Sequence, residues 1–193
     1  LFDHHLAVDA KGAVLTVRRR DAVTRRVREG ERVTVDGIGV ELSVLEIPAH
    51  TRSHISFHND DMLFCGDTLF ACGCGRIFEG TPAQMLHSLR QLAALPDHTR
   101  VCCAHEYTLS NLKFALAVEP GNHDLQQYQQ RCKQLREQGI PTLPSDILTE
   151  RQINPFLRTT LDEVIQSVRK QTPLARSEVE VFAALREWKN IFR

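Results

Sequence analysis

The sequence predicts an α+β protein with strands in its front part and helices in its back part. Runs of alternating or uninterrupted apolar residues, such as 40–47 and 62–65, are typical of strands. From residue 106 onward, apolar residues recur almost throughout at the three-and-four spacing of helices. We therefore expect two units, residues 1–105 and 106–193.

Four strands are expected in the front unit. Residues 40–47 alternate apolar and polar side chains and stop at a proline, which cannot continue a sheet ladder. Residues 55–57 carry apolar side chains two apart, and the uniformly apolar run 62–65 follows a turn-forming Asn-Asp-Asp. The fourth strand is the short apolar run 101–104.

Capping residues mark the helix boundaries. Thr81 is an N-cap candidate, Pro82 suits the first helical position and Gln84 completes a capping box, while Pro96 ends the helix. A proline-marked loop is expected in the middle of the back unit. Four further helices are expected. Three cover residues 109–118, 125–135 and 161–168, and the fourth follows the capping pair Ser177 and Glu180.

The composition excludes several classes of partner. The 24 basic residues cancel the 24 acidic ones, so no global field would attract nucleic acid or an anionic membrane. An arginine-rich stretch before residue 34 lacks the aromatic residues of a nucleic-acid site and is interpreted as a solvated edge. No apolar run reaches the roughly 18 residues that span a bilayer. We expect neither a nucleic-acid nor a membrane partner.

The cysteines and the first residue bear on the cellular setting. Six unevenly spaced cysteines are too few for a secreted disulfide framework at this length, which predicts a reducing, cytoplasmic compartment. The chain begins with Leu1 rather than Met. We expect that the start was processed or cut, or that the chain is not the whole gene product.

Three of the strand runs end in side chains that bind metals. His50 follows the first run, Asp67 the third and His105 the fourth, each just past the carboxyl end of its strand. Loops at that edge of a sheet converge on one crevice. Two imidazoles and a carboxylate can hold a borderline or hard cation there. A single such histidine is more commonly an ordinary core or surface residue.

Two other groups of residues offer ligand types. Asp3 and His4 supply a carboxylate and an imidazole, although adjacent residues in a terminus are commonly just solvated. His54 lies four residues after His50, and the flanking strand pattern favours a positioning role for it over a ligand role.

The cysteines suggest a competing metal site, which we disfavour. It would combine two close pairs, Cys72 with Cys74 and Cys102 with Cys103. Adjacent residues in a strand point to opposite faces, so the second pair cannot face one ion. Buried thiols acting as small apolar groups are the favoured interpretation.

Arg186 and Lys189 lie three residues apart on the last predicted helix and therefore share a face. Neither has an acidic neighbour three or four positions away, so the like charges repel by a few tenths of a kcal/mol. An anionic ligand would relieve that repulsion. The helix dipole also favours cations near a C-terminus, and both interpretations stay open at this point.

Longer motifs resemble glyoxalase II, the hydroxyacylglutathione hydrolase of the metallo-β-lactamase superfamily, from residue 30 to the end. The motifs are IPAHTRSH (47–54), CGDTLF (65–70), GCGR (73–76), FEG (78–80), AHEYT (104–108), NLKFA (111–115), VEPGN (118–122) and NPF (154–156). The resemblance implies a metallo-β-lactamase αβ/βα sandwich, incomplete at its N-terminal side, followed by a small all-helical domain that helps to bind glutathione.

The resemblance also implies a ligand set. His50 would bind a first metal ion and His105 a second, with Asp67 bridging them. Asp3 and His4 match the end of the family signature Thr-His-x-His-x-Asp-His and would complete the second site, with Asp3 also orienting the attacking water. The rest of the signature and the family's opening strands then fall outside the chain. Two divalent cations are implied, with zinc favoured over iron or manganese, or only one if the first site stays incomplete.

Glutathione contacts are implied for Arg76, Phe78, Tyr107, Arg186 and Lys189. Phe78 stands where the family frequently has tyrosine, so a hydroxyl contact to substrate would be missing. Ala49 and Ser53 replace two usual glycines, which is tolerable unless those backbones need positive φ.

The implied activity is hydrolysis of glutathione thioesters such as S-lactoylglutathione to glutathione and a hydroxy acid, a step of methylglyoxal detoxification. The enzyme would be a cytoplasmic monomer that uses metal-activated water. One alternative is a truncated or degenerate relative that binds a metal or glutathione without turnover. Another is a persulfide dioxygenase-like or nuclease member of the superfamily, against which Arg186 and Lys189 argue.

Overall fold

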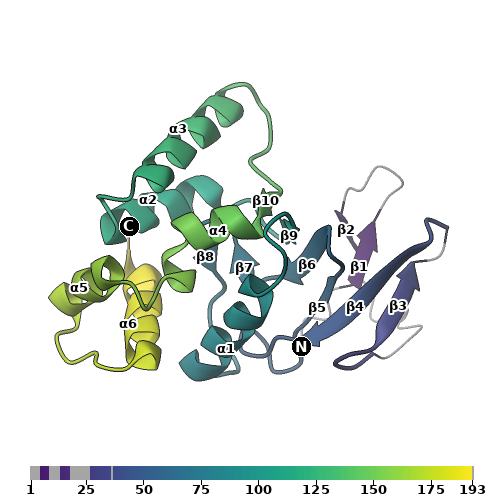
Figure 1. Ribbon diagram of the computed structural model, residues 1–193, viewed down its shortest axis with the longest axis horizontal. Helices are drawn as coiled ribbons and strands as arrows, with labels where there is room; N and C mark the ends of the chain where they lie inside the picture. The colour runs from purple at the N-terminus through teal and green to yellow at the C-terminus, as the bar shows by residue number, and fades with distance from the viewer. Residues whose placement is uncertain (1–4, 9–13, 18–26, 36, 193) are drawn as a thin grey trace.

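The centre of the molecule is a six-stranded sheet with the order β10-β9-β6-β5-β4-β3. The computed structural model describes residues 5–8, 14–17, 27–35 and 37–192. Figure 1 shows the sheet on one side and the helices of the back half on the other. The strands of this sheet are β3 (Arg32–Val35), β4 (Val40–Glu46), β5 (Ile55–His58), β6 (Met62–Gly66), β9 (Arg100–Cys103) and β10 (Ser145–Asp146).

The strand directions bring three strand ends to one edge of the sheet. β5 is antiparallel to both β4 and β6, and β6 is parallel to β9, so β4, β6 and β9 point the same way. The register pairs Val44 with Phe57, Phe57 with Phe64, and Leu63 with Val101. All four predicted strands are confirmed, and the loops after β4, β6 and β9 leave from the same edge.

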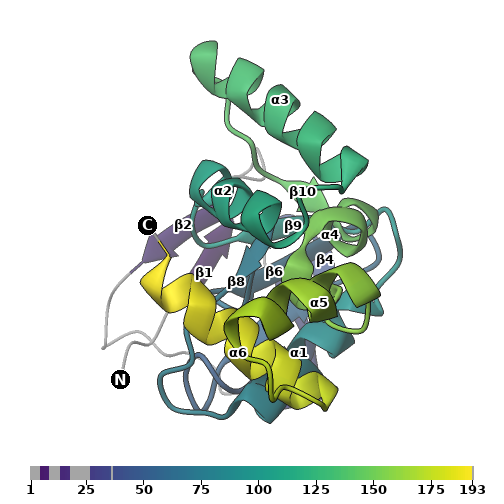
Figure 2. The same cartoon turned by 90° about the vertical axis from the view of Figure 1, so that its left-hand side faces the viewer.

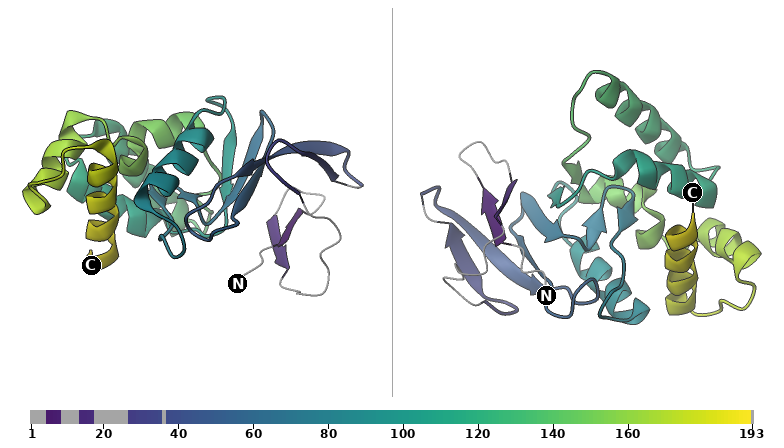
Figure 3. Two further views of the ribbon diagram at one scale, coloured as in Figure 1. Left: turned by 90° about the horizontal axis from the view of Figure 1, so that it is seen from below. Right: turned by 180° about the vertical axis from the view of Figure 1, so that it is seen from behind.

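Other strands were not predicted from the sequence. β1 (His5–Val8) and β2 (Val14–Val17) form a separate two-stranded sheet, seen beside the main sheet in Figure 3. β7 (Leu69–Phe70) and β8 (Gly73–Cys74) form a short hairpin. Strands of two residues, such as β7, β8 and β10, are too short for an apolar period to appear.

Most helices of the back half lie in front of the sheet in Figure 2, and α3 (His123–Glu137) projects at the top. The helices of this half are α2 (Thr108–Val118), α3, α4 (Ile147–Ile153), the 3-10 helix η1 (Pro155–Leu157), α5 (Asp162–Gln171) and α6 (Glu178–Ile191), and α1 (Pro82–Ala93) precedes them in the chain. The predicted capping boxes at Thr81 and Ser177 are both formed. None of the helices in the described residues combines the length and apolar character needed to cross a bilayer.

The expected proline-marked loop contains more regular structure than predicted. Ser145 and Asp146 pair with β9 as β10, so the back half is not wholly helical. Asp146 then caps α4, because its side chain accepts a hydrogen bond from the Thr149 N–H at 2.7 Å. At seven residues, α4 is too short for its apolar spacing to stand out in the sequence.

The main hydrophobic core takes residues from both expected units. It includes Ile47 and Met85 from the front and Phe114, Phe156 and Phe182 from the back. The ring of Phe156 lies 6.0 Å from that of Phe114 and 5.8 Å from that of Phe182. The helical half is therefore packed onto the sheet half through a shared apolar interior.

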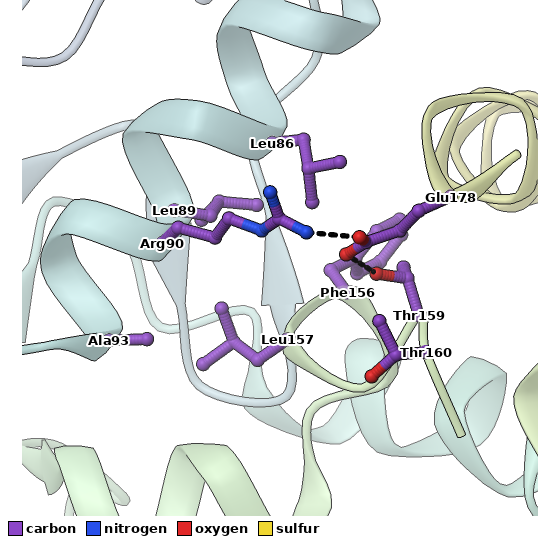
Figure 4. A pocket seen from close by; sticks show the side chains of 9 residues that line it. All are labelled: Leu86, Leu89, Arg90, Ala93, Phe156, Leu157, Thr159, Thr160 and Glu178. Carbon is purple, nitrogen blue, oxygen red and sulfur yellow. Dashed lines mark hydrogen bonds and ion pairs between the residues drawn. The ribbon is translucent and has the colours of Figure 1, made fainter.

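An ion pair also joins the two halves, beside a small pocket between α1, η1 and α6 (Figure 4). Arg90 of α1 binds Glu178 at the start of α6, and Glu178 also accepts from the Thr159 hydroxyl at 2.9 Å. The pocket is lined by both apolar and polar side chains, and its lining includes none of the predicted site residues.

A buried ion pair holds the helices of the back half together. Glu119 is fully buried, and both of its oxygens lie 3.0 Å from Arg158 Nε. A second guanidinium nitrogen lies 2.9 Å from Oε1. Removing one partner of such a pair leaves an uncompensated buried charge.

We predict that Arg158→Met lowers the free energy of unfolding by about 3 kcal/mol, because Glu119 loses its buried partner. Urea denaturation at pH 7 measures this change. The matched control is Arg151→Met, which removes an exposed pair with Asp97 and should cost under about 1 kcal/mol. Equal losses in the two variants would contradict the buried-pair argument.

Candidate metal centre

The three predicted ligand side chains meet at the edge of the sheet. The carboxylate of Asp67 lies between two imidazoles: its Oδ2 is 3.6 Å from His50 Nε2, and its Oδ1 is 3.3 Å from His105 Nε2. The side chain of Asp67 is 9% exposed, that of His50 14% and that of His105 48%. The group is therefore closed on the His50 side and open to solvent on the His105 side.

The separations suit metal coordination. Two ligand atoms bound to one tetrahedral ion at about 2.0–2.2 Å stand roughly 3.3–3.6 Å apart. The histidines face different oxygens of Asp67, which allows one carboxylate to serve a cation on each side. Within the described residues, no three His, Cys, Asp or Glu side chains form a complete site for a single ion. The described side chains therefore fit two ions that share the Asp67 carboxylate and take their remaining ligands from other groups.

The backbone of Asp67 is held by His54. The Asp67 N–H donates to His54 Nε2 at 3.2 Å. The preceding Gly66 has φ +53°, and a Cβ there would lie only 2.6 Å from the same nitrogen. His54 therefore positions the backbone of Asp67, as expected, while its ring also lies edge-on to that of His50 at 5.6 Å. Gly66 must lack a side chain.

A second contact fixes the orientation of His50. Its Nδ1 lies 2.9 Å from the backbone oxygen of Arg76. With Nδ1–H donating to that carbonyl, Nε2 keeps its lone pair on the side of Asp67. A Cβ at Gly75 would stand 1.8 Å from the Asp67 carbonyl oxygen and 3.4 Å from His50 Nδ1, so only glycine permits this approach.

The backbone at Ala49 departs from expectation. Its φ is +141°, a conformation that side chains rarely adopt, so the replacement of glycine by alanine is not neutral here. The residue is fully buried, and its carbonyl oxygen accepts from the Gly80 N–H at 3.1 Å and the Glu79 N–H at 3.4 Å. These contacts hold the strained segment directly before His50. Ser53 is not among the positive-φ residues.

Aromatic rings stand on both sides of the site. The ring of Phe78 lies 5.1 Å from that of His50, and the ring of Tyr107 stacks on that of His105 at 4.9 Å. Phe78 is 66% exposed and Tyr107 50%. Phe70 packs edge-on against Tyr107 at 5.3 Å. Both predicted aromatic residues thus border the metal-type ligands and face solvent.

The predicted cations have different environments. Arg76 is exposed. Arg186 is buried: Nη1 donates to the Cys74 carbonyl oxygen at 2.8 Å, and its Nε has no hydrogen-bond partner among the described residues. Lys189 Nζ donates to the Ser110 carbonyl oxygen at 3.2 Å. Burial, and after it the neighbouring Arg186 charge, lower the pKa of Lys189 to about 8.

Two predictions cannot be placed, and one alternative loses support. Asp3 and His4 lie outside the described residues. All six cysteines are free thiols, and burial is the main cause that raises their pKa values. No group of three or more metal-type ligands involving them is found among the described residues, which agrees with thiols acting as small apolar groups.

Sequence reasoning missed the groups that hold the ligands in place. The Arg76 carbonyl has no signature, because any residue type supplies the same backbone oxygen. Gly66 and Gly75 stand out in the sequence only as parts of motifs. A glycine next to a candidate ligand was the one available signal.

The comparisons with known proteins agree with this architecture. Residues 7–105 match the family model described as the metallo-beta-lactamase superfamily, and residues 106–192 match the one described as hydroxyacylglutathione hydrolase C-terminus.

Curated relatives named hydroxyacylglutathione hydrolase are similar to most of the chain. A relative from Albidiferax ferrireducens is 59% identical over 82% of this chain and 64% of its own length. One from Shewanella baltica is 55% identical over 83% and 63%, and one from Nitrosomonas europaea is 48% identical over 89% and 66%. The chain thus spans slightly less than two thirds of the length of these relatives.

We predict that Ala49→Gly raises the free energy of unfolding by about 1 kcal/mol, because relief of the positive-φ strain exceeds the entropy lost by glycine. Chemical denaturation measures the change. Ala49→Val serves as the opposite variant and should destabilise, since a branched side chain is worse in this conformation. A stabilising valine would contradict the strain at this position.

Proposed function

The chain belongs to the metallo-beta-lactamase superfamily and, within it, to the hydroxyacylglutathione hydrolases, and on that premise we propose that it hydrolyses glutathione thioesters such as S-lactoylglutathione. The products are glutathione and a hydroxy acid. The observation that carries the proposal is the meeting of His50, Asp67 and His105 at one edge of the sheet.

The superfamily implies divalent metal ions, and the described residues fit them. In the proposal, His50 would hold one ion and His105 a second, and Asp67 would serve both. Asp3 and His4 would complete the second site. Zinc suits this set of imidazole and carboxylate ligands, as do iron and manganese. When bound, such ions lower the pKa of water from about 15.7 toward 7 and polarise the thioester carbonyl.

The chain's own residues prepare the site for that chemistry. The hydrogen bond from His50 Nδ1 to the Arg76 carbonyl selects the tautomer that leaves Nε2 free. The hydrogen bond from the Asp67 N–H to His54 fixes the backbone from which the carboxylate extends. Asp3 is proposed to orient the attacking water. No serine or cysteine nucleophile is required, in agreement with buried thiols of raised pKa.

The substrate is proposed to lie across the exposed rings of Phe78 and Tyr107. Arg76, Arg186 and Lys189 then supply positive charge for the glutathione carboxylates. Phe78 offers an apolar surface and no hydroxyl. Positioning of the thioester by these contacts brings its carbonyl to the metal ligands, which lowers the entropic part of the barrier.

A cytoplasmic monomer completes the proposal. Six free cysteines agree with a reducing compartment.

A second candidate is a chain that binds metal or glutathione without turnover. It is favoured by one observation, that the described residues offer the first ion only His50 and Asp67. Elemental analysis beside a thioester assay separates the two: about two ions with turnover support the hydrolase, and one or none without turnover supports the second candidate.

We predict that Asp67→Ala abolishes metal binding and thioester hydrolysis together, because both proposed ions lose their shared ligand. Elemental analysis and an assay with S-lactoylglutathione measure the two effects. Asp61→Ala is the matched control, since Asp61 is an exposed aspartate at the other end of β6 and should leave both unchanged. Full metal content with full activity in Asp67→Ala would sink the ligand assignment.

We also predict that binding of S-methylglutathione weakens by up to about tenfold between pH 7 and pH 9, as Lys189 loses its proton through a pKa of about 8. The ammonium is present below that pKa and lost above it, so affinity falls as pH rises. Calorimetric titration across this range measures the profile. Lys189→Arg keeps its charge throughout and should remove the dependence. An unchanged profile in Lys189→Arg would show that another group titrates.

A further inference from the structure

The β7–β8 hairpin, residues Leu69–Cys74, is bound by buried side chains of the helical half. Each of its last five residues has a backbone group hydrogen-bonded to such a side chain. Asn154 Nδ2 donates to the carbonyl oxygens of Phe70 at 3.2 Å and Gly73 at 3.0 Å. Asn111 Nδ2 donates to the carbonyl oxygen of Ala71 at 3.0 Å, and Arg186 Nη1 donates to that of Cys74 at 2.8 Å. The Cys72 N–H donates to Glu150 Oε2 at 2.9 Å.

These contacts follow from burial. The hairpin strands pair with each other over only two residues each, and the turn between them is buried. Buried backbone polar groups need partners, since leaving one unpaired costs about as much as a lost hydrogen bond. The side chains that supply the partners are themselves at most 6% exposed. The helical half thus fixes the hairpin by polar contacts from which water is excluded.

Glu150 has the least ordinary position in this group. It is fully buried, and no cation pairs with it in the part of the chain that the structure describes. Its Oε1 accepts from the Ser145 hydroxyl at 2.7 Å, and its Oε2 accepts from the Cys72 N–H and from Asn154 Nδ2, both at 2.9 Å. Burial raises the pKa of Glu150 to about 7. Burying a carboxyl group costs desolvation energy. In return, Glu150 holds the Cys72 N–H and the Asn154 side chain, which both take part in the hairpin's contacts.

The hairpin lies between the two contacts that shape the metal site. Asp67 precedes it by two residues and Arg76 follows it by two. The Gly75 N–H donates to the Thr68 carbonyl oxygen at 3.0 Å and closes the base of the hairpin. The next carbonyl, that of Arg76, holds His50 Nδ1. Any tilt of the hairpin therefore moves the backbone beside Asp67 and the acceptor of His50 together.

We propose that Glu150 is a positioning residue of the metal site, acting from α4 through the β7–β8 hairpin. This inference rests on the proposed function, because it takes His50 and Asp67 to be metal ligands. Glu150 contacts neither of them. It acts through the Cys72 N–H and Asn154, and it gives the helical half a role in metal binding besides that of contacting glutathione.

Three variants separate positioning from general stabilisation. Glu150→Ala removes the acceptor of the Cys72 N–H. Glu150→Gln restores it, because the amide oxygen can replace Oε2 while the amide nitrogen donates to the Ser145 hydroxyl. Glu119→Ala is the matched control: Glu119 is equally buried in the helical half, but its side chain pairs with Arg158 and not with the hairpin.

Hydrogen exchange of the metal-free protein gives the first test. We expect amides in residues 67–76 to exchange at least about tenfold faster in Glu150→Ala, relative to β6, while Glu150→Gln stays close to wild type. Glu119→Ala should leave residues 67–76 unchanged. If Glu150→Ala does not fold, Asn111→Ala removes only the bond to Ala71 and should show the same local effect. Unchanged exchange in this segment overturns the inference.

Zinc affinity, measured by competition with a chromophoric chelator, gives the second test. Glu150→Ala should bind zinc about 10- to 100-fold more weakly, as is usual when an outer partner of a metal ligand is lost, and Glu150→Gln should recover most of the affinity. Equal losses of zinc affinity in Glu150→Ala and Glu119→Ala would show that the effect reflects general destabilisation, and would overturn the inference. Wild-type protein that binds none of zinc, iron and manganese would instead contradict the proposed function, with the exchange test still deciding the role of Glu150 in the hairpin.

Discussion

The candidate site depends on two points where the backbone is approached more closely than any side chain would permit. Asp67 lies between two such approaches. On one side, a Cβ at Gly66 would stand 2.6 Å from His54 Nε2, and on the other, a Cβ at Gly75 would stand 1.8 Å from the Asp67 carbonyl oxygen. The first approach lets the Asp67 N–H reach its acceptor, and the second brings the following carbonyl to His50. The carboxylate is placed between two imidazoles because the chain around it carries no side chain at these two points.

Close packing around the β7–β8 hairpin also joins the sheet half to the helical half. The hairpin after Asp67 is too short to satisfy its own polar groups, and water does not reach them. Asn111 and Glu150 are polar residues of the helical half that provide what the hairpin lacks. Phe156 and Phe182 extend the apolar core across the same boundary, and Arg90 adds an ion pair at its rim. The two halves on either side of residue 105 therefore share one hydrophobic core. They differ in secondary structure, which is mainly strand before this residue and mainly helix after it.

Much of the fold could be predicted because its central elements have clear local patterns. The strands that place the ligands are either alternating or wholly apolar, so the positions of His50, Asp67 and His105 along the chain are sufficient to indicate one sheet edge. What could not be predicted has no local signal. A strand of two residues shows no period, and the backbone oxygen that orients His50 belongs to no residue type. The conformation of Ala49 is equally invisible, because its φ of +141° is accompanied by hydrogen bonds to its carbonyl from Glu79 and Gly80, which are far away in the sequence.

The two cations of α6 show what the structure adds to explanations that the sequence leaves open. The helix dipole is one explanation for a cation near a C-terminus, and Lys189 does lie in the last turn of α6. Arg186 lies a turn earlier, where the dipole contributes little, and its guanidinium is used on the Cys74 carbonyl, with one nitrogen left unpartnered among the described residues. Burial and the Arg186 charge lower the pKa of Lys189, so the local environment disfavours the ammonium even at a favourable helix end. The dipole favours Lys189 more than Arg186, whose guanidinium has a structural partner in the Cys74 carbonyl. A bound anion would offset the desolvation of Lys189 and its repulsion from Arg186 together, which neither the helix nor any described carboxylate does.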